Sequence, residues 1–164
     1  MIKLLRVDHR LLHGQVAFSW TSYLEADCIL IANDEVVNNS LRMTTIKLAK
    51  PAGVKLVVKN IQDSIKAIRE GKTDKYKLFI VVESVIDAEK IAKETGVIKS
   101  INLGGTKPGS DKVSISKVVS LTKEDIKSIE RLNEDGIIVE VRQVPNDRKL
   151  DAVELLKVKI KGEK

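Results

Sequence analysis

The chain contains very little cysteine, which limits both its covalent structure and its chemistry. Among its 164 residues there is a single cysteine, Cys28. One cysteine forms no internal disulfide and is too few for a cysteine-based metal framework, which agrees with a reducing compartment. Because Cys28 lies in an almost continuous apolar run, we expect a core residue and not a nucleophile. We therefore expect no structural metal.

Aromatic residues and long apolar runs are also scarce. The chain has one Trp, two Tyr and two Phe. Proteins that bind single-stranded nucleic acid usually stack bases on several spaced aromatic side chains, so the composition argues against this class. No apolar run approaches the ~20 residues that a membrane-spanning helix needs, and the first residues lack a signal peptide's apolar stretch. We expect a cytoplasmic protein.

The residues that are present are those of an ordinary globular domain. Hydrophobic residues make up 43% of the chain and charged residues 32%, which is enough for a core and for solubility. The 29 Lys and Arg exceed the 23 Asp and Glu by six. Such a surplus suits nucleic acid, a membrane surface, phosphorylated ligands or an acidic partner protein. The densest basic stretch, residues 157–164, is terminal, and we expect a solvated tail there.

Short apolar segments typical of strands alternate with segments of helical periodicity along the chain. The predicted strands cover residues 2–7, 26–32, 54–58, 78–82, 99–103 and 137–141, with a short edge strand at 113–116. The predicted helices cover residues 14–24, 37–50, 60–71, 84–96, 122–136 and 150–156. Parallel strands require crossover connections that cover both faces of the sheet. The sequence therefore predicts one α/β domain over residues 1–164, with three layers (α/β/α) and a mainly parallel sheet of six or seven strands.

Three loops that follow predicted strands carry polar residues. Open parallel sheets bind ligands at the carboxyl ends of their strands, so these loops are candidate binding segments. The first, residues 8–15, holds both histidines of the chain. The second contains Asn33 and Asp34, and the third contains Gly104, Gly105 and Thr106.

The first loop has the parts of a phosphoryl acceptor. His13 precedes a predicted helix N-terminus, where the dipole favours an anion and a neutral imidazole, and a neutral imidazole is a nucleophile. Arg10 carries a planar fork of donors suited to phosphate oxygens, and Gly14 lets the backbone approach a ligand closely. Asp8 could orient an imidazole or hold Arg10. Together they indicate a histidine that accepts and passes on a phosphoryl group.

Other interpretations of these loops stay open. His13 could be an ordinary exposed loop histidine, and His9 is a rival acceptor. The loop from Gly104 to Thr106 could offer amides and a hydroxyl to an anion or form a plain turn. Asn33 and Asp34 could support the first loop or start the next helix. Because the Walker A, dinucleotide-binding and zinc-ligand motifs are missing, the competing function is a non-catalytic α/β domain that binds nucleic acid or a phosphorylated small ligand.

The segment Ile2–Val16, a strand followed by Asp-x-Arg-Leu-x-His-Gly-Gln-Val, resembles the IIB component of the bacterial phosphotransferase system, mannose/fructose/sorbose family. The likeness spans nearly the whole chain. Supporting matches are residues 33–34, 102–105, 116–122 and 139–145.

The resemblance implies a sugar phosphotransferase without a cofactor or a nucleic-acid partner. His13 would take a phosphoryl group from a phosphohistidine of the IIA partner and give it to a sugar entering through the IIC/IID membrane complex. Arg10 would contact the phosphate, with Asp8, Gly14 and Gln15 completing the loop. Such a protein is expected in the cytoplasm, peripherally associated with the membrane permease. His9 departs from the family pattern, in which we expect a residue other than histidine, often acidic.

Overall fold

The strands form one seven-stranded sheet with the spatial order β3-β2-β4-β1-β5-β8-β9. The computed structural model describes residues 1–162. All neighbouring strands are parallel except β9, which is antiparallel to β8. The strands are β1 (Ile2–Asp8), β2 (Cys28–Ala32), β3 (Lys55–Lys59), β4 (Leu78–Val82), β5 (Ser100–Gly105), β8 (Ile138–Val141) and β9 (Leu150–Asp151).

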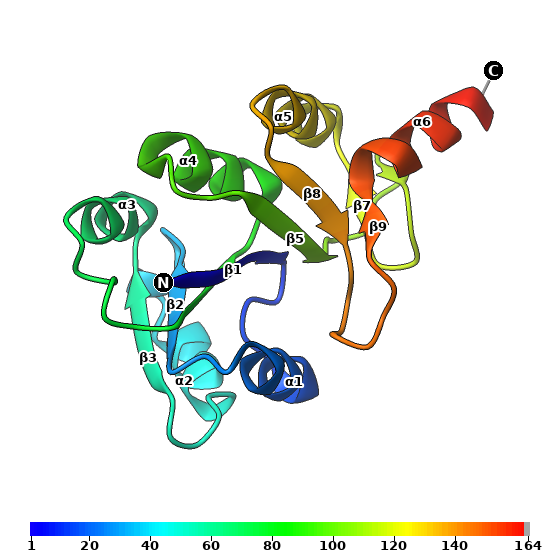
Figure 1. Cartoon of the computed structure of the whole chain (residues 1–164). Helices are drawn as coiled ribbons and strands as arrows, with labels where there is room; N and C mark the ends of the chain where they lie inside the picture. Colours follow the sequence, from blue (N-terminus) through cyan, green and yellow to red (C-terminus); the bar gives the residue numbers. More distant parts are fainter. Residues whose placement is uncertain (163–164) are drawn as a thin grey trace.

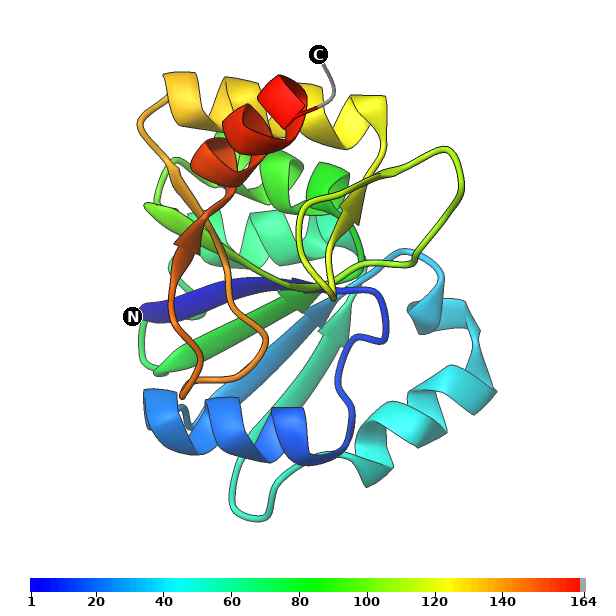
Figure 2. The same cartoon turned by 90° about the vertical axis from the view of Figure 1, so that its right-hand side faces the viewer.

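Helices cover both faces of this sheet (Figures 1 and 2). Helices α1 and α2 lie on one face, and α3, α4 and α5 lie on the other, with α6 beside α5. The three-layer α/β/α fold predicted from the sequence is therefore confirmed. The helices are α1 (Gly14–Leu24), α2 (Ser40–Leu48), α3 (Ile61–Arg69), α4 (Val85–Thr95), α5 (Lys123–Glu134) and α6 (Ala152–Gly162), with a short 3₁₀ helix at Val36–Asn38.

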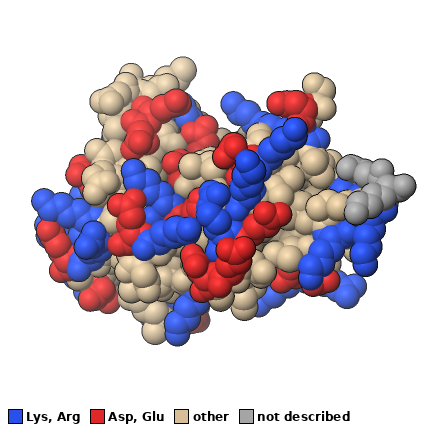
Figure 3. Space-filling view, turned by 90° about the horizontal axis from the view of Figure 1, so that it is seen from above, with Lys and Arg blue, Asp and Glu red and all other residues tan. Residues whose placement is uncertain are grey.

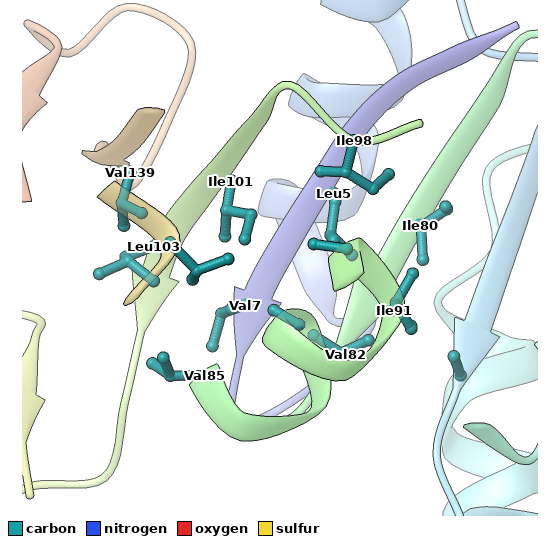
Figure 4. Close-up of a cluster of buried hydrophobic side chains, with 14 of the residues drawn as sticks. Leu5, Val7, Ile80, Val82, Val85, Ile91, Ile98, Ile101, Leu103 and Val139 are labelled. Atoms are coloured by element: carbon teal, nitrogen blue, oxygen red, sulfur yellow. The ribbon is translucent and has the colours of Figure 1, made fainter. Parts of the chain in front are cut away.

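The core lies on both faces of the central strands. Strands β2 and β4 are buried along their whole length, which explains their unbroken apolar sequences. Between the sheet and α4, Leu5 and Val7 of β1 pack with Ile80 and Val82 of β4 and with Ile91 (Figure 4). On the other face, a second cluster collects around Trp20, Ile29 and Phe79. Cys28 is buried in the first cluster, as predicted.

Side-chain caps fix where three of the helices begin. Asn60, Ser84 and Thr122 each accept a hydrogen bond from the backbone amide three residues later. Asp125 returns a bond to the Thr122 amide, which completes a capping box despite its short side chain. The helices predicted over residues 60–71, 84–96 and 122–136 thus begin after these cap residues, and local chemistry determines these helix starts.

The predicted helix over residues 37–50 is divided in the structure. A 3₁₀ helix at Val36–Asn38 precedes α2, and Asn39 lies between them with an extended backbone. The Asn39 side chain accepts a hydrogen bond from the amide of Arg42 and caps α2. A cap residue competes with helix continuation, which the apolar spacing alone does not show.

Three predictions for the second half of the chain need correction. Residues 150–156 are not all helical, because Leu150 pairs with Val141 as β9 before α6 begins. Residues 157–162 are exposed, as expected of a solvated stretch, but they belong to α6 and are not an irregular tail, and residues 163–164 lie outside the described residues. The predicted edge strand at 113–116 is instead β6 (Val113–Ser114), which pairs with β7 (Ser120–Leu121) in a separate two-stranded sheet. Over residues 1–162, no helix is both long enough and apolar enough to span a membrane.

Candidate active site

The carboxylate of Asp8 is the centre of a polar cluster at the end of β1. Asp8 is fully buried, in the strand that lies between β4 and β5. Its Oδ2 accepts a hydrogen bond from the guanidinium of Arg6 at 3.1 Å and lies 2.9 Å from Nε2 of His13. Its Oδ1 accepts from the backbone amide of Arg10 at 3.0 Å, and the Nε of Arg10 lies at 3.5 Å. One carboxylate therefore organises three of the charged or titratable side chains around it.

The hydrogen bonds to Asp8 determine its charge. Burial alone would raise its pKa, but the bonds from His13 and from the Arg10 backbone, with the charge of Arg6, lower the pKa of Asp8 to about 2. Asp8 is therefore ionised at neutral pH and can only accept hydrogen bonds. In the contact between Asp8 and His13, the hydrogen must therefore be carried by Nε2 of His13. In the neutral form of the ring, the other nitrogen, Nδ1, then keeps a free lone pair.

The loop from Asp8 to His13 has an unusual backbone. The amide of Leu11 bonds to the Asp8 carbonyl at 2.9 Å, and Leu11 has a φ of +59° although it is not glycine. Gly14 has a φ of +39°, a conformation that L side chains rarely adopt, which explains glycine here. His13 is the N-cap of α1, with no side chain capping the helix. The uncapped first-turn amides belong to Gly14, Gln15 and Val16.

Arg6 belongs to this polar cluster and was missed by the sequence analysis. Its side chain is 1% exposed, and besides Asp8 it donates to Oδ1 of Asn102 at 2.8 Å and to the carbonyl of Arg142 at 3.2 Å. Burial lowers the pKa of Arg6, and the charge of Asp8 opposes that shift. A Cβ on Gly104 would lie 2.0 Å from Cζ of Arg6, so only glycine fits there. The signal was an arginine two residues before Asp8, on the same face of a strand.

Trp20 of α1 packs against the back of this cluster. The guanidinium carbons of Arg6 and Arg142 each lie 5.3 Å from the centre of its ring, within cation–π range. The indole donates a hydrogen bond to the carbonyl of Gln143 at 2.9 Å. These contacts connect α1, which begins directly after His13, to the segment that follows β8.

The third predicted loop contacts the cluster through Gly104 and Gly105. The carbonyl of Gly105 accepts a hydrogen bond from the amide of His9 at 3.0 Å, and Gly104 makes room for Arg6. The hydroxyl of Thr106 donates to the Ser120 carbonyl and accepts from the Ser120 amide, both at 2.7 Å. Thr106 thus joins the end of β5 to β7, and within residues 1–162 its side chain forms no hydrogen bond with the first loop.

Asn33 and Asp34 lie after β2 and organise the turn there. The Asn33 side chain accepts from two amides of the following turn and donates to Glu83 at 2.7 Å. Asp34 accepts from the amide of Ile61 at the start of α3. Over residues 1–162, neither side chain forms a hydrogen bond with Asp8 or His13, so their observed role is in the turn.

His9 points to the other side of Asp8. Its Nδ1 is buried, lies 4.0 Å from Oδ1 of Asp8, and has no hydrogen-bond partner among the described residues. The ring lines a small cleft between the loop after β5 and the first turns of α4 and α5, together with Ser84, Thr106, Lys107, Lys112 and Asp125. His9 therefore lacks the close carboxylate contact that His13 has. Over residues 1–162, no cluster of three or more His, Cys, Asp or Glu side chains could hold a metal ion.

Comparison with known proteins decides the family. The family model described as "PTS system sorbose subfamily IIB component" matches residues 2–164. The chain belongs to this family. The resemblance seen in the first loop is thus confirmed, and a IIB component of this family takes part in phosphoryl transfer within a sugar phosphotransferase system.

Relatives and solved structures agree with this assignment. This IIB component is 36% identical over 138 residues to a probable phosphotransferase enzyme IIB component of Streptococcus pyogenes, covering 80% of this chain and 84% of the relative. It is 31% identical over 156 residues to the mannose-specific EIIAB component of Escherichia coli, covering 95% of this chain and 48% of that relative. The crystal structure of the IIBSor domain of the sorbose permease from Klebsiella pneumoniae superposes with a TM-score of 0.91 at 27% identity, covering 96% and 97% of the two chains.

Proposed function

We propose that this IIB component carries the phosphoryl group on Nδ1 of His13, receiving it from a phosphohistidine of a IIA partner and passing it to a sugar. The observation that supports this most directly is the 2.9 Å contact between Nε2 of His13 and the ionised carboxylate of Asp8. A carboxylate that holds one imidazole nitrogen in its protonated form leaves the other as a nucleophile.

In the first step, the lone pair of His13 Nδ1 attacks the phosphorus of the donor. The bond between phosphorus and the donor nitrogen breaks, and the donor nitrogen keeps that electron pair. The His13 ring gains positive charge as its Nδ1–P bond forms. Asp8, which holds the Nε2 hydrogen, stabilises this charge and fixes the orientation of the ring.

The transferred group carries negative charge on its oxygens, and the site has cationic and dipolar partners for it. The uncapped amides at the N-terminus of α1 lie directly after His13, where the helix dipole favours an anion. Arg10 is 46% exposed at its side chain, and its Nε is only 3.5 Å from Asp8. Its guanidinium is therefore close to the site and still free to contact phosphate oxygens. Gln15 is exposed on the first turn of α1, directly after Gly14.

In the second step, a sugar hydroxyl oxygen attacks the phosphorus. The P–Nδ1 bond breaks, its electrons return to Nδ1, and the hydroxyl proton leaves to solvent. The His13 ring then returns to its starting form, in which the Nε2–H group donates a hydrogen bond to Asp8. The side chain of His13 is 22% exposed, so partner and sugar can reach it from outside.

The family supports the partners that we propose. The mannose-specific relative bears the name EIIAB, which joins an A and a B component in one protein. A IIA protein or domain is the proposed donor here, and IIC and IID membrane subunits are proposed to present the sugar. The IIB component would work at the membrane through these subunits.

Transfer of labelled phosphate tests this function. Phosphoenolpyruvate carrying ³²P, the general phosphotransfer proteins and a IIA protein should label the wild type and His9→Ala but not His13→Ala. Trypsin cuts after Arg10, so His9 and His13 fall on different peptides, residues 7–10 and 11–42. Arg10→Ala should slow labelling at least tenfold, since one lost transition-state donor costs about 10²–10³ in rate. Label on residues 7–10, or retained by His13→Ala, would move the acceptor to His9, and no label in the wild type would overturn the proposed function.

A further inference from the structure

A cleft of about 540 Å³ lies between β3 and α3, away from the His13 loop. Strand β3 is an edge strand, and Lys55, Val57 and Lys59 alternate along it so that they share one face. Helix α3 packs against β2 and α4, which leaves this face of β3 partly uncovered. The floor of the cleft is apolar and includes Leu30, Val57 and Ala67.

Four lysines surround the apolar floor: Lys55, Lys59, Lys72 and Lys75. Lys72 already pairs with Glu70 at 3.0 Å. Lys55 donates a hydrogen bond to the phenol of Tyr76 at 2.8 Å, and Lys55 and Lys75 lie 5.1 and 5.2 Å from the centre of that ring.

Within residues 1–162, three of these four lysines, Lys59 and Lys75 among them, have no carboxylate partner. No Asp or Glu of the described residues lines the cleft. The positively charged ammonium groups of neighbouring lysines repel one another. A bound anion attracts these ammonium groups and offsets their repulsion. The cleft therefore combines an apolar surface with an unbalanced positive rim.

We propose that this cleft binds a small amphipathic organic anion, with its apolar body along Val57 and its acid group at the positive rim to which Lys59 and Lys75 belong. The volume falls in the range of about 300–1,000 Å³ typical of small-ligand pockets. Two lysine ammonium groups lie within 5.2 Å of the centre of the Tyr76 ring, which adds positive charge at this end of the cleft.

The cleft is separate from the phosphoryl-transfer site. Cys28 and Lys55 are the first residues of β2 and β3, and both line the cleft. Asp8 is the last residue of β1, which runs parallel to them in the same sheet. Lys59, the last residue of β3, lines the cleft too, so the cleft follows the whole of β3. Strands β2 and β4 lie between β3 and β1, so the cleft is separated from His13 by two strands.

Binding of 1-anilinonaphthalene-8-sulfonate, an aromatic sulfonate that fluoresces in apolar surroundings, tests the proposal. Its uncharged counterpart N-phenyl-1-naphthylamine has the same rings without the sulfonate. The sulfonate should bind at one site at least tenfold more tightly than the neutral compound. It should shift the methyl NMR signals of Leu30 and Val57. The double variant Lys59→Gln/Lys75→Gln should weaken binding of the sulfonate at least tenfold.

The matched control is Lys47→Gln/Lys66→Gln, which removes two exposed helix lysines outside the cleft and should bind like the wild type. Val57→Glu adds a carboxylate to the half-buried floor and should also abolish binding while keeping the circular dichroism spectrum. Phosphorylation of His13 should proceed unchanged in the cleft variants. Equal binding by Lys59→Gln/Lys75→Gln and wild type, equal affinity for the neutral compound, or methyl shifts confined to other residues would each overturn the proposal.

Discussion

At the scale of single residues, the site depends on the hydrogen bonds that the carboxylate of Asp8 accepts. Asp8 accepts from Arg6, from the Arg10 backbone and from His13, and each contact has a different consequence. Arg6 compensates the buried charge, the Arg10 amide fixes the loop, and His13 is held with Nδ1 free. The same bonds make the ionised form of Asp8 more stable in the folded protein than in the unfolded chain.

Asp8 should therefore contribute stability that depends on pH. Its pKa falls from an ordinary 3.8 to about 2 on folding, so its contribution is present above pH 3.8 and is lost as pH falls through about 2. Nearly two pKa units correspond to about 2 kcal/mol. Asp8→Asn should lower the free energy of unfolding by at least about that amount at pH 7, since Arg6 also loses its partner.

Urea unfolding of both proteins from pH 7 down to pH 2 measures this effect. The difference between wild type and Asp8→Asn should shrink toward the acidic end. Asp111→Asn, which changes an exposed loop carboxylate, is the control and should leave stability within about 0.5 kcal/mol. A constant difference across the pH range would show that Asp8 acts through packing and not through its charge.

At the scale of elements, the site is assembled from strand ends far apart in the chain. β1 supplies Arg6 and Asp8, β5 supplies Asn102 and Gly104, and the segment after β8 supplies the Arg142 carbonyl. Two adjacent glycines at the end of β5 illustrate how closely these strands meet. A Cβ on Gly104 would overlap the Arg6 guanidinium, whereas a Cβ on Gly105 would find its nearest neighbours at 3.7–3.9 Å.

Gly104→Ala and Gly105→Ala should therefore behave differently. Gly104→Ala displaces the buried Arg6 from Asp8, and breaking such a pair costs about 3–5 kcal/mol. Gly105→Ala makes only ordinary contacts and should cost about 1 kcal/mol or less. Thermal unfolding of the two variants compares them directly, and equal losses for both would contradict the packing of Arg6 on Gly104.

The sequence was informative about elements wherever the deciding interactions are local. The alternation of strands and helices, and the caps at Asn60, Ser84 and Thr122, follow from nearby residues. Interactions between distant segments could not be predicted in this way. Arg6 lies within the predicted strand over residues 2–7 and receives no role there, because its partner Asn102 lies 96 positions away. Leu150 was placed in a helix because its pairing with Val141 depends on the path of the chain between them.

At the scale of the whole molecule, the surplus of six positive charges is spread over a mixed surface. On the face formed by α4, α5 and α6, Lys and Arg side chains lie among Asp and Glu (Figure 3). The net charge can still attract an acidic or phosphorylated IIA partner over long distances.

Transfer from phosphorylated IIA should consequently slow as salt rises. Raising ionic strength from about 0.05 to 0.5 M shortens the Debye length to a few ångströms, and the second-order rate constant should fall several-fold. Rapid-quench measurements at several salt concentrations, with a dilute IIA protein, determine that rate constant. A rate constant that is insensitive to salt would exclude steering by charge.

The central claim, that Nδ1 of His13 bonds to phosphorus, has one direct measurement. Protein with ¹⁵N-labelled histidine is phosphorylated through IIA and kept at alkaline pH, and the one-bond coupling between ³¹P and ¹⁵N is assigned to a ring nitrogen. We predict coupling to Nδ1 of His13 alone, with Nε2 still facing Asp8. Coupling to Nε2 of His13, or to either nitrogen of His9, would contradict the account.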